Sequence, residues 1–160
     1  IMRYYNYWLS ILVFLCSCSK TDECNVLWSK AINYYDTKDY NNCMVLLHDI
    51  IEQYPHSSKS PQSYYLISEI YLNEYKNYDI SIEYLKKLIS LYPNNELSKK
   101  SLFTLAYIYG NYIDSFTEST EYYNKFVEKY PNDDLIPSVL YELKNLESIN
   151  VKIDSLVNKL

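Results

Sequence analysis

The chain has 160 residues, of which only one is a glycine, and its formal net charge is −5. A single glycine cannot build the glycine-rich loops of Walker-type or dinucleotide-binding sites, and it argues against an antiparallel β fold with tight hairpins. The acidic balance argues against nucleic acid as a partner, because phosphate binding needs a basic surface. With 48% hydrophobic and 22% charged residues, the composition predicts one helical, globular domain.

The N-terminal segment, residues 1–17, has the pattern of a secretory signal peptide. Arg3 stands before a short apolar run from Trp8 to Leu15, and small residues follow the run. A basic start, a short apolar run and a small-residue exit are typical of such signals. The run is far shorter than the roughly 20 apolar residues that a membrane-spanning helix needs. We therefore expect residues 1–17 to be removed on export.

The C-terminal end of this segment and the residue after it carry a more specific pattern, Leu15-Cys16-Ser17-Cys18. It resembles a bacterial lipobox, in which a leucine and two small residues precede the cysteine that is lipidated. The resemblance implies a covalent diacylglyceryl lipid on Cys18, with acyl chains such as palmitate, and a lipidated tether over residues 18–24. Ser19 favours the outer membrane, because inner-membrane lipoproteins often carry Asp at this position. The alternative is an ordinary secretory signal in which the cysteine occurs by chance.

The prolines mark an internal repeat of constant length. Tyr-Pro pairs occur at equal intervals, at 54–55, 92–93 and 130–131, and Pro61 and Pro137 lie two of these intervals apart. Proline ends a helix at the preceding residue and is accepted in the first turn of the next helix. The prolines therefore predict a junction between helices at the end of each unit.

Between the junctions, apolar residues recur at helical spacing and predict two helices in each unit. Small residues recur at one position of each expected helix, where a larger side chain would push the two helices apart. They are Ala31, Ser68 and Ala106 in the first helices and Cys43, Ser81 and Ser119 in the second helices. The expected pairs are Leu27–Tyr35 with Asn41–Tyr54, Pro61–Tyr75 with Asp79–Tyr92, and Lys99–Tyr112 with Thr117–Tyr130.

The segment from Asp39-Tyr40 through Cys43 and Leu47 to Tyr54-Pro55 is similar to the second half of the tetratricopeptide repeat (TPR) motif. Leu27, Ala31 and Tyr34 match positions of its first half. The resemblance implies an all-α, TPR-like α-solenoid of antiparallel helix pairs, whose last repeat needs a cap. The expected boundaries are repeats at 25–60, 61–98 and 99–136, a partial fourth repeat from 137 to 147, and a capping helix at 148–160.

Residues that could perform chemistry are few. His48 and His56 have no Cys, Asp or Glu at the spacing of metal ligands, so we expect no metal site and no cofactor other than the covalent lipid. No Ser/His/Asp or Cys/His arrangement predicts catalysis, and we expect a protein that is not an enzyme. Cys24 and Cys43 could form a disulfide in an oxidising compartment. Two free thiols are favoured, because Cys43 fills a helix-crossing position while Cys24 precedes the first helix.

The first helix of each TPR-like unit lines a concave groove, so its residues outside the core are candidates for binding a partner. Aromatic residues repeated along a groove suit an extended peptide or a partner helix. The competing interpretation is that the same residues pack between neighbouring helices. The candidates are Trp28, Tyr35, Tyr65, Glu69, Phe103 and Tyr107.

A lipobox followed by TPR-like units that end in Tyr-Pro is similar to the BamD (ComL) group of outer-membrane lipoproteins. The resemblance implies a scaffold, held in the outer membrane and facing the periplasm, that binds a barrel-assembly subunit or an unfolded outer-membrane protein. This sequence departs from that group in holding three complete units rather than five. The alternatives are a TPR adaptor of the Tol-Pal-associated YbgF type and a lipoprotein that binds a peptide or a solute.

Overall fold

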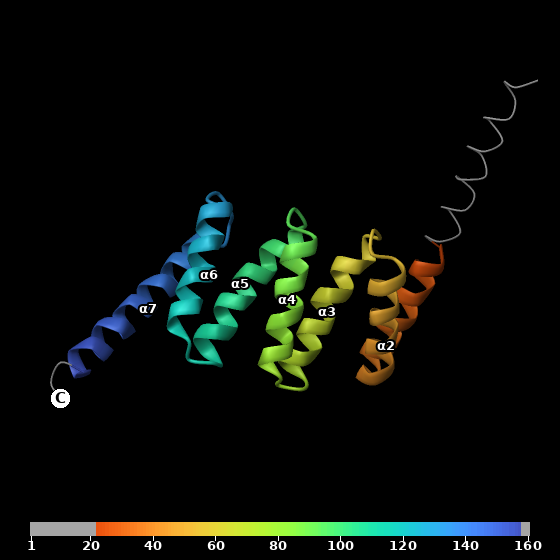
Figure 1. Ribbon diagram of the computed structural model, residues 1–160, viewed down its shortest axis with the longest axis horizontal. Coiled ribbons are helices and arrows are strands. Elements are labelled where there is room, and N and C mark those ends of the chain that lie inside the picture. Colours follow the sequence, from red (N-terminus) through yellow and green to blue (C-terminus); the bar gives the residue numbers. More distant parts are fainter. Residues whose placement is uncertain (1–21, 158–160) are drawn as a thin grey trace, which may run out of the picture. The chain divides into compact units, whose positions relative to one another are not determined.

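The computed structural model describes residues 22–157, which are helical throughout apart from short turns and contain no strand. The expected signal peptide, 1–17, and the expected lipidation residue, Cys18, lie outside the described residues. A first helix runs from residue 22 to residue 36. Figure 1 labels the six that follow, which are α2 (Tyr40–Gln53), α3 (Lys59–Asn73), α4 (Tyr78–Leu91), α5 (Glu96–Asn111), α6 (Phe116–Lys129) and α7 (Ile136–Val157). This helical architecture confirms the expected all-α class.

Local sequence signals account for where the helices begin and end. The side chains of Asp39 and Asn77 accept hydrogen bonds from backbone N–H groups in the first turns of α2 and α4, which is the bonding of an N-cap. The second helix of each unit ends at the tyrosine of a Tyr-Pro pair, because the following proline cannot continue a helix.

Two boundaries differ from the expected ones. The first helix already includes residues 22–24, which we had expected in the tether, and Cys24 is buried. At the other end, α7 runs without a break from Ile136 to Val157. The expected partial fourth repeat and the described part of the expected capping helix are therefore one continuous helix.

The described residues form two compact parts, 22–67 and 68–157. In the first part, Ala31 and Cys43 are both fully buried, as expected of small residues where two helices cross. Ser60, at the start of α3, donates a hydrogen bond to the carbonyl oxygen of Tyr54 at 2.5 Å. This bond ties the beginning of α3 to the end of α2.

In the second part, the small residues let side chains reach the backbone of the partner helix. Ser81 Oγ donates to the carbonyl oxygen of Ser68 at 2.9 Å, and Ser119 Oγ donates to that of Ala106 at 2.8 Å. A Cβ atom added to Gly110 would lie only 2.8 Å from Ser119 Oγ. The expected close crossings are thus present, and the glycine of the sequence lies at one of them.

The hydrophobic core of the second part includes a cluster shared by α5, α6 and α7. Its buried members are Leu102, Ala106, Tyr123, Phe126, Val139 and Leu146. The two residues from α7, Val139 and Leu146, cover side chains that α6 would otherwise expose. In this way α7 closes the apolar surface of the last complete repeat.

Candidate partner-binding groove

Two candidates lie on the first helix and make aromatic contacts within residues 22–67. The indole of Trp28 is half-buried, and Lys59 Nζ of α3 lies 5.1 Å from its ring centroid, in a cation–π arrangement. Tyr35 is also half-buried and meets Tyr40 edge-on, with 5.8 Å between the ring centroids. The third candidate of this part, Tyr65 of α3, is half-buried. These side chains are partly covered by neighbours and partly open to solvent.

Phe103 of α5 serves the core. Its ring meets Tyr123 and Phe126 of α6 edge-on, with centroids 5.7 Å and 6.4 Å apart, and it packs against the core cluster of α5, α6 and α7. The packing interpretation therefore describes this residue.

Tyr107 lies one helical turn further along α5 and is 39% exposed. Its ring meets Tyr112 edge-on at 5.7 Å, and Tyr112 stacks on Tyr78 with 4.7 Å between the centroids. The hydrogen bond with Tyr112 is the main cause that raises the pKa of the Tyr107 hydroxyl. Tyr107 is thus the candidate of α5 that presents aromatic surface to solvent.

Glu69 of α3 is half-buried, and burial raises the pKa of its carboxyl group, an effect that the charge of Lys100 partly offsets. A carboxylate placed in this way favours a partner that brings a positive charge or a hydrogen-bond donor.

The aromatic residues that begin the second helices were not among the groove candidates. Tyr40, Tyr78 and Phe116 are spaced by one repeat period and start α2, α4 and α6. Tyr40 contacts the candidate Tyr35, and Tyr78 supports Tyr112 beside the candidate Tyr107. Their regular spacing was a visible signal, since it matches the period of the prolines.

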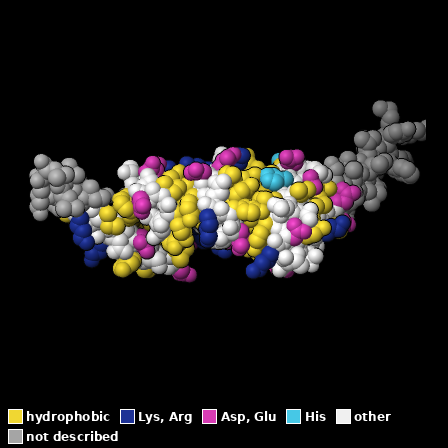
Figure 2. Space-filling view, turned by 90° about the horizontal axis from the view of Figure 1, so that it is seen from below, with side chains coloured by type: hydrophobic (Ala, Val, Ile, Leu, Met, Phe, Trp, Pro, Cys, Tyr) yellow, Lys and Arg dark blue, Asp and Glu magenta, His cyan; other side chains and the backbone are white. Residues whose placement is uncertain are grey.

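The face in Figure 2 carries acidic and basic side chains interspersed with exposed hydrophobic ones. Large hydrophobic side chains are exposed on the helices, as Tyr107 of α5 and Tyr141 of α7 are, and in the turns that follow α3 and α5, as Tyr75 and Tyr112 are. Tyrosine is one of the residues enriched at the cores of protein–protein interfaces.

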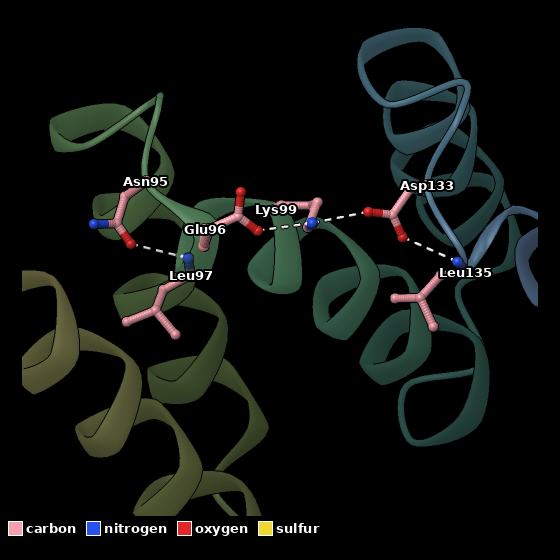
Figure 3. Close-up of polar contacts among 6 residues, drawn as sticks. All are labelled: Asn95, Glu96, Leu97, Lys99, Asp133 and Leu135. Carbon is pink, nitrogen blue, oxygen red and sulfur yellow. Dashed lines mark hydrogen bonds and ion pairs between the residues drawn. The ribbon is translucent and has the colours of Figure 1, made fainter.

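An ion-pair network fixes the start of α5, the helix that holds Phe103 and Tyr107. Lys99 Nζ lies 2.7 Å from a carboxylate oxygen of Glu96 and 2.8 Å from one of Asp133, which lies between α6 and α7 (Figure 3). The second oxygen of Asp133 accepts a hydrogen bond from the backbone N–H of Leu135 at 2.9 Å. Lys99 and this N–H together lower the pKa of Asp133.

The sequence model of the tetratricopeptide repeat matches residues 26–57, 62–95 and 100–133, which is more than half of the chain. The chain belongs to the tetratricopeptide-repeat family. No curated protein matches it at a significant level. The three matched ranges fall within the expected units 25–60, 61–98 and 99–136, so the repeat that was inferred from the prolines is confirmed.

The tetratricopeptide repeat is typically a non-catalytic scaffold for protein–protein interaction, and this chain shares its helix pairs. Among residues 22–157, no group of three or more His, Cys, Asp or Glu side chains is arranged to hold a metal ion. Within the same range, no helix has the length and apolar character needed to cross a membrane.

The remaining titratable candidates of this TPR protein have structural surroundings. Cys24 and Cys43 are buried free thiols, and Cys24 Sγ donates a hydrogen bond to Ser57 Oγ at 3.2 Å. Burial, with a contribution from the charge of Asp39, raises the pKa of the Cys43 thiol to about 11. A thiol in this state is a poor nucleophile at neutral pH. His56 is exposed in the turn before α3, and His48 is half-buried on α2.

Proposed function

We propose that this protein is a non-catalytic lipoprotein scaffold of the cell envelope, held in the outer membrane by a lipid on Cys18 and facing the periplasm. In this role it binds protein partners in the assembly of outer-membrane β-barrel proteins, as in the BamD group. The observation that carries the proposal is the order of features along the chain, in which three tetratricopeptide repeats follow a lipobox-like sequence. The exposed aromatic surface at Tyr107 supports it.

The lipid anchor is tested by the variant Cys18→Ser, expressed in a Gram-negative host. We expect the wild-type protein in the membrane fraction and the variant in the soluble periplasmic fraction, because two or more acyl chains are needed for stable anchoring. Incorporation of labelled palmitate into the wild type alone is the companion measurement. A variant that stays in the membrane would refute the anchor.

The partner is tested by recovery of the tagged protein from solubilised membranes. We expect a barrel-assembly subunit to be recovered with the wild type and to be depleted with Tyr107→Ala, which removes an exposed aromatic side chain of α5. The matched control is Tyr141→Ala, whose side chain is 65% exposed on α7. Recovery of Tol or Pal components instead would identify the adaptor alternative. If both variants recover equally little of the barrel-assembly subunit, Tyr107 is not a specific part of the binding site.

A further inference from the structure

A second surface site lies between α4, α5 and α6, and none of the six groove candidates lines it. It is a cavity of about 640 Å³ that both lysines and apolar side chains line. Three lysines and one glutamate line it, which leaves a net charge of +2 in a chain whose net charge is −5. Its lining residues are Lys86, Ile89, Ser90, Leu102, Tyr122, Lys125, Glu128 and Lys129.

Two of these lysines point their ammonium groups at neutral oxygens. Lys86 Nζ donates to the hydroxyl of Tyr109 at 2.9 Å, and Lys129 Nζ donates to the carbonyl oxygen of Pro93 at 2.7 Å. The hydrogen bond with Tyr109 is the main cause that raises the pKa of Lys86, which keeps the amine charged at neutral pH. Lys125 is paired with a carboxylate, that of Glu121, at 2.6 Å.

Stacked aromatic rings support the lysines. Tyr109 and Tyr122 lie nearly parallel, with 5.7 Å between their centroids and 6° between their planes. Lys86 Nζ is 5.5 Å from the Tyr109 ring, and Lys125 Nζ is 4.9 Å from the Tyr122 ring. The stack therefore supports two positive charges that line the cavity. Leu102, which is buried, and the half-buried Ile89 supply apolar wall.

The internal repeat shows that the TPR architecture does not require these charges. One repeat period earlier in the chain, Lys86 corresponds to His48 and Lys129 corresponds to Leu91. The aromatic and apolar positions are kept over the same interval, since Tyr122 corresponds to Tyr84 and Ile89 to Ile51. The same helix positions thus hold a histidine and a leucine one repeat earlier. The repeat architecture does not require lysines at these two positions, and in the later repeat both lysines line the cavity.

We propose that this cavity binds an acidic segment of a protein partner, whose carboxylates pair with Lys86 and Lys129 and whose neighbouring apolar side chain packs against Ile89 and Leu102. A peptide carboxylate fits the lining better than a phosphate group does. Lining residues from α4, α5 and α6 lie within their helices, so their amide groups are used by the helices rather than offered to an anion. Arginine, which pairs with phosphate through two hydrogen bonds, occurs in this chain only as Arg3.

The test measures binding of synthetic peptides to the full chain in detergent by calorimetry at about pH 7.5, where histidine is largely neutral. The probes are acetyl-Glu-Phe-Glu-Leu-Glu-amide and its counterpart with Lys in place of each Glu. The key variant combines Lys86→His and Lys129→Leu, which installs residues that occur at the same positions of the preceding repeat. We expect the wild type to bind the acidic peptide and not the basic one. The key variant should bind the acidic peptide about tenfold more weakly. High salt should weaken binding of the acidic peptide to the wild type.

The control variant combines Lys87→His and Lys144→Leu, which removes the same charge outside the cavity and should leave acidic-peptide affinity unchanged. Lys86→His with Lys129→Leu also removes the bonds to Tyr109 and Pro93, so thermal unfolding is used to show that both double variants are folded at the temperature of the binding measurement. Failure of the acidic peptide to bind, equal binding of both peptides, or unchanged affinity of the key variant would overturn the proposal. The proposal would also be overturned if the protein bound phosphatidylglycerol vesicles through these lysines but did not bind the acidic peptide. Tyr107→Ala should keep acidic-peptide binding, which separates this site from the proposed barrel-assembly role.

Discussion

At the scale of single residues, Asp133 shows how one side chain can join two elements. Its carboxylate forms an ion pair with Lys99 of α5 and also accepts a hydrogen bond from the backbone N–H of Leu135, just before α7. Asn95 and Ser57 occupy the same position of the earlier units. Their side chains likewise accept a hydrogen bond from the backbone N–H of the residue two positions later in the chain. The local turn is therefore a repeated feature, while the ion pair is peculiar to Asp133, because Asn95 and Ser57 carry no carboxylate and Pro61 stands one repeat before Lys99.

The ion pair predicts a pH-dependent contribution to stability. Because Lys99 lowers the pKa of Asp133 below its usual value of 3.8, the contribution is fully present above the unfolded-state pKa of about 4 and is lost as the pH falls through the lower folded-state value. Asp133→Asn should keep an acceptor for Leu135 but lose the charge. We expect it to unfold at lower urea concentration than the wild type at about pH 6, with the difference vanishing towards about pH 2.

The control for this prediction is Lys99→Met, in which the carboxylate has lost its cationic partner. In that background Asp133→Asn should have little effect at about pH 6, as a double-mutant cycle requires of a coupled pair. A difference between wild type and Asp133→Asn that stays constant with pH would contradict the assignment.

At the scale of elements, each helix pair is joined by a turn with one residue in the left-handed region. Lys38, Lys76 and Asp114 have φ values of 61°, 53° and 56°, and they occupy the same position of successive repeats. In the second and third units the following residue donates its N–H six residues back, from Asn77 to Tyr71 and from Ser115 to Tyr109. In the first unit the corresponding bond spans five residues, from Asp39 to Tyr34, and with the bond from Lys38 to Tyr35 it makes a Schellman motif. Glycine is the usual residue at the left-handed position of such helix ends.

Lys76→Gly should therefore stabilise the protein. A non-glycine residue in the left-handed conformation costs about 1–2 kcal/mol, and the extra freedom that glycine gives the unfolded chain offsets part of the gain. We expect the free energy of unfolding in urea to rise by about 0.5–1 kcal/mol.

The matched control is Lys144→Gly, an exposed lysine within α7. There the same substitution should lower the free energy of unfolding by about 0.7–1 kcal/mol, because glycine is a poor helix former. We expect the free energy of unfolding to rise for Lys76→Gly and to fall for Lys144→Gly. A loss at both would show that Lys76 does not need the conformational freedom of glycine.

At the scale of the whole molecule, a repeat array has to cover the apolar face of its last unit. Within residues 68–157, α7 does this through Val139 and Leu146, which are buried against Tyr123 and Phe126 of α6. The other side of α7 leaves Leu140 and Tyr141 exposed. The helix thus has a packed face and an open face.

The cap can be tested with two leucines of the same helix. Leu146 is 6% exposed and Leu140 is 51% exposed. Leu146→Ala should lower the free energy of unfolding by about 2–4 kcal/mol, since it removes buried surface and leaves a cavity, while Leu140→Ala should change it by less than about 0.5 kcal/mol. Urea denaturation of both variants measures this. If the two variants lower the free energy of unfolding by similar amounts, α7 does not cover the last repeat through Leu146.

The sequence by itself determined the repeat period, the ends of the second helices at the Tyr-Pro pairs and the small residues at the crossings. These properties depend on local chemistry, because proline stops a helix, Asp and Asn cap one, and a small side chain at a fixed spacing permits close approach. Ser81 and Ser119 were predicted from spacing alone, and their hydrogen bonds to the partner helices follow from that placement.

The tertiary structure decided which face of a helix is covered, and this no local rule supplies. Phe103 and Tyr107 are four residues apart and were both groove candidates, but the rings of α6 pack against the first while the second is exposed. Lys86, Lys125 and Lys129 come from two helices and line one cavity only because α4, α5 and α6 pack together. Burial and charge at a surface depend on which helices become neighbours, and packing alone determines that.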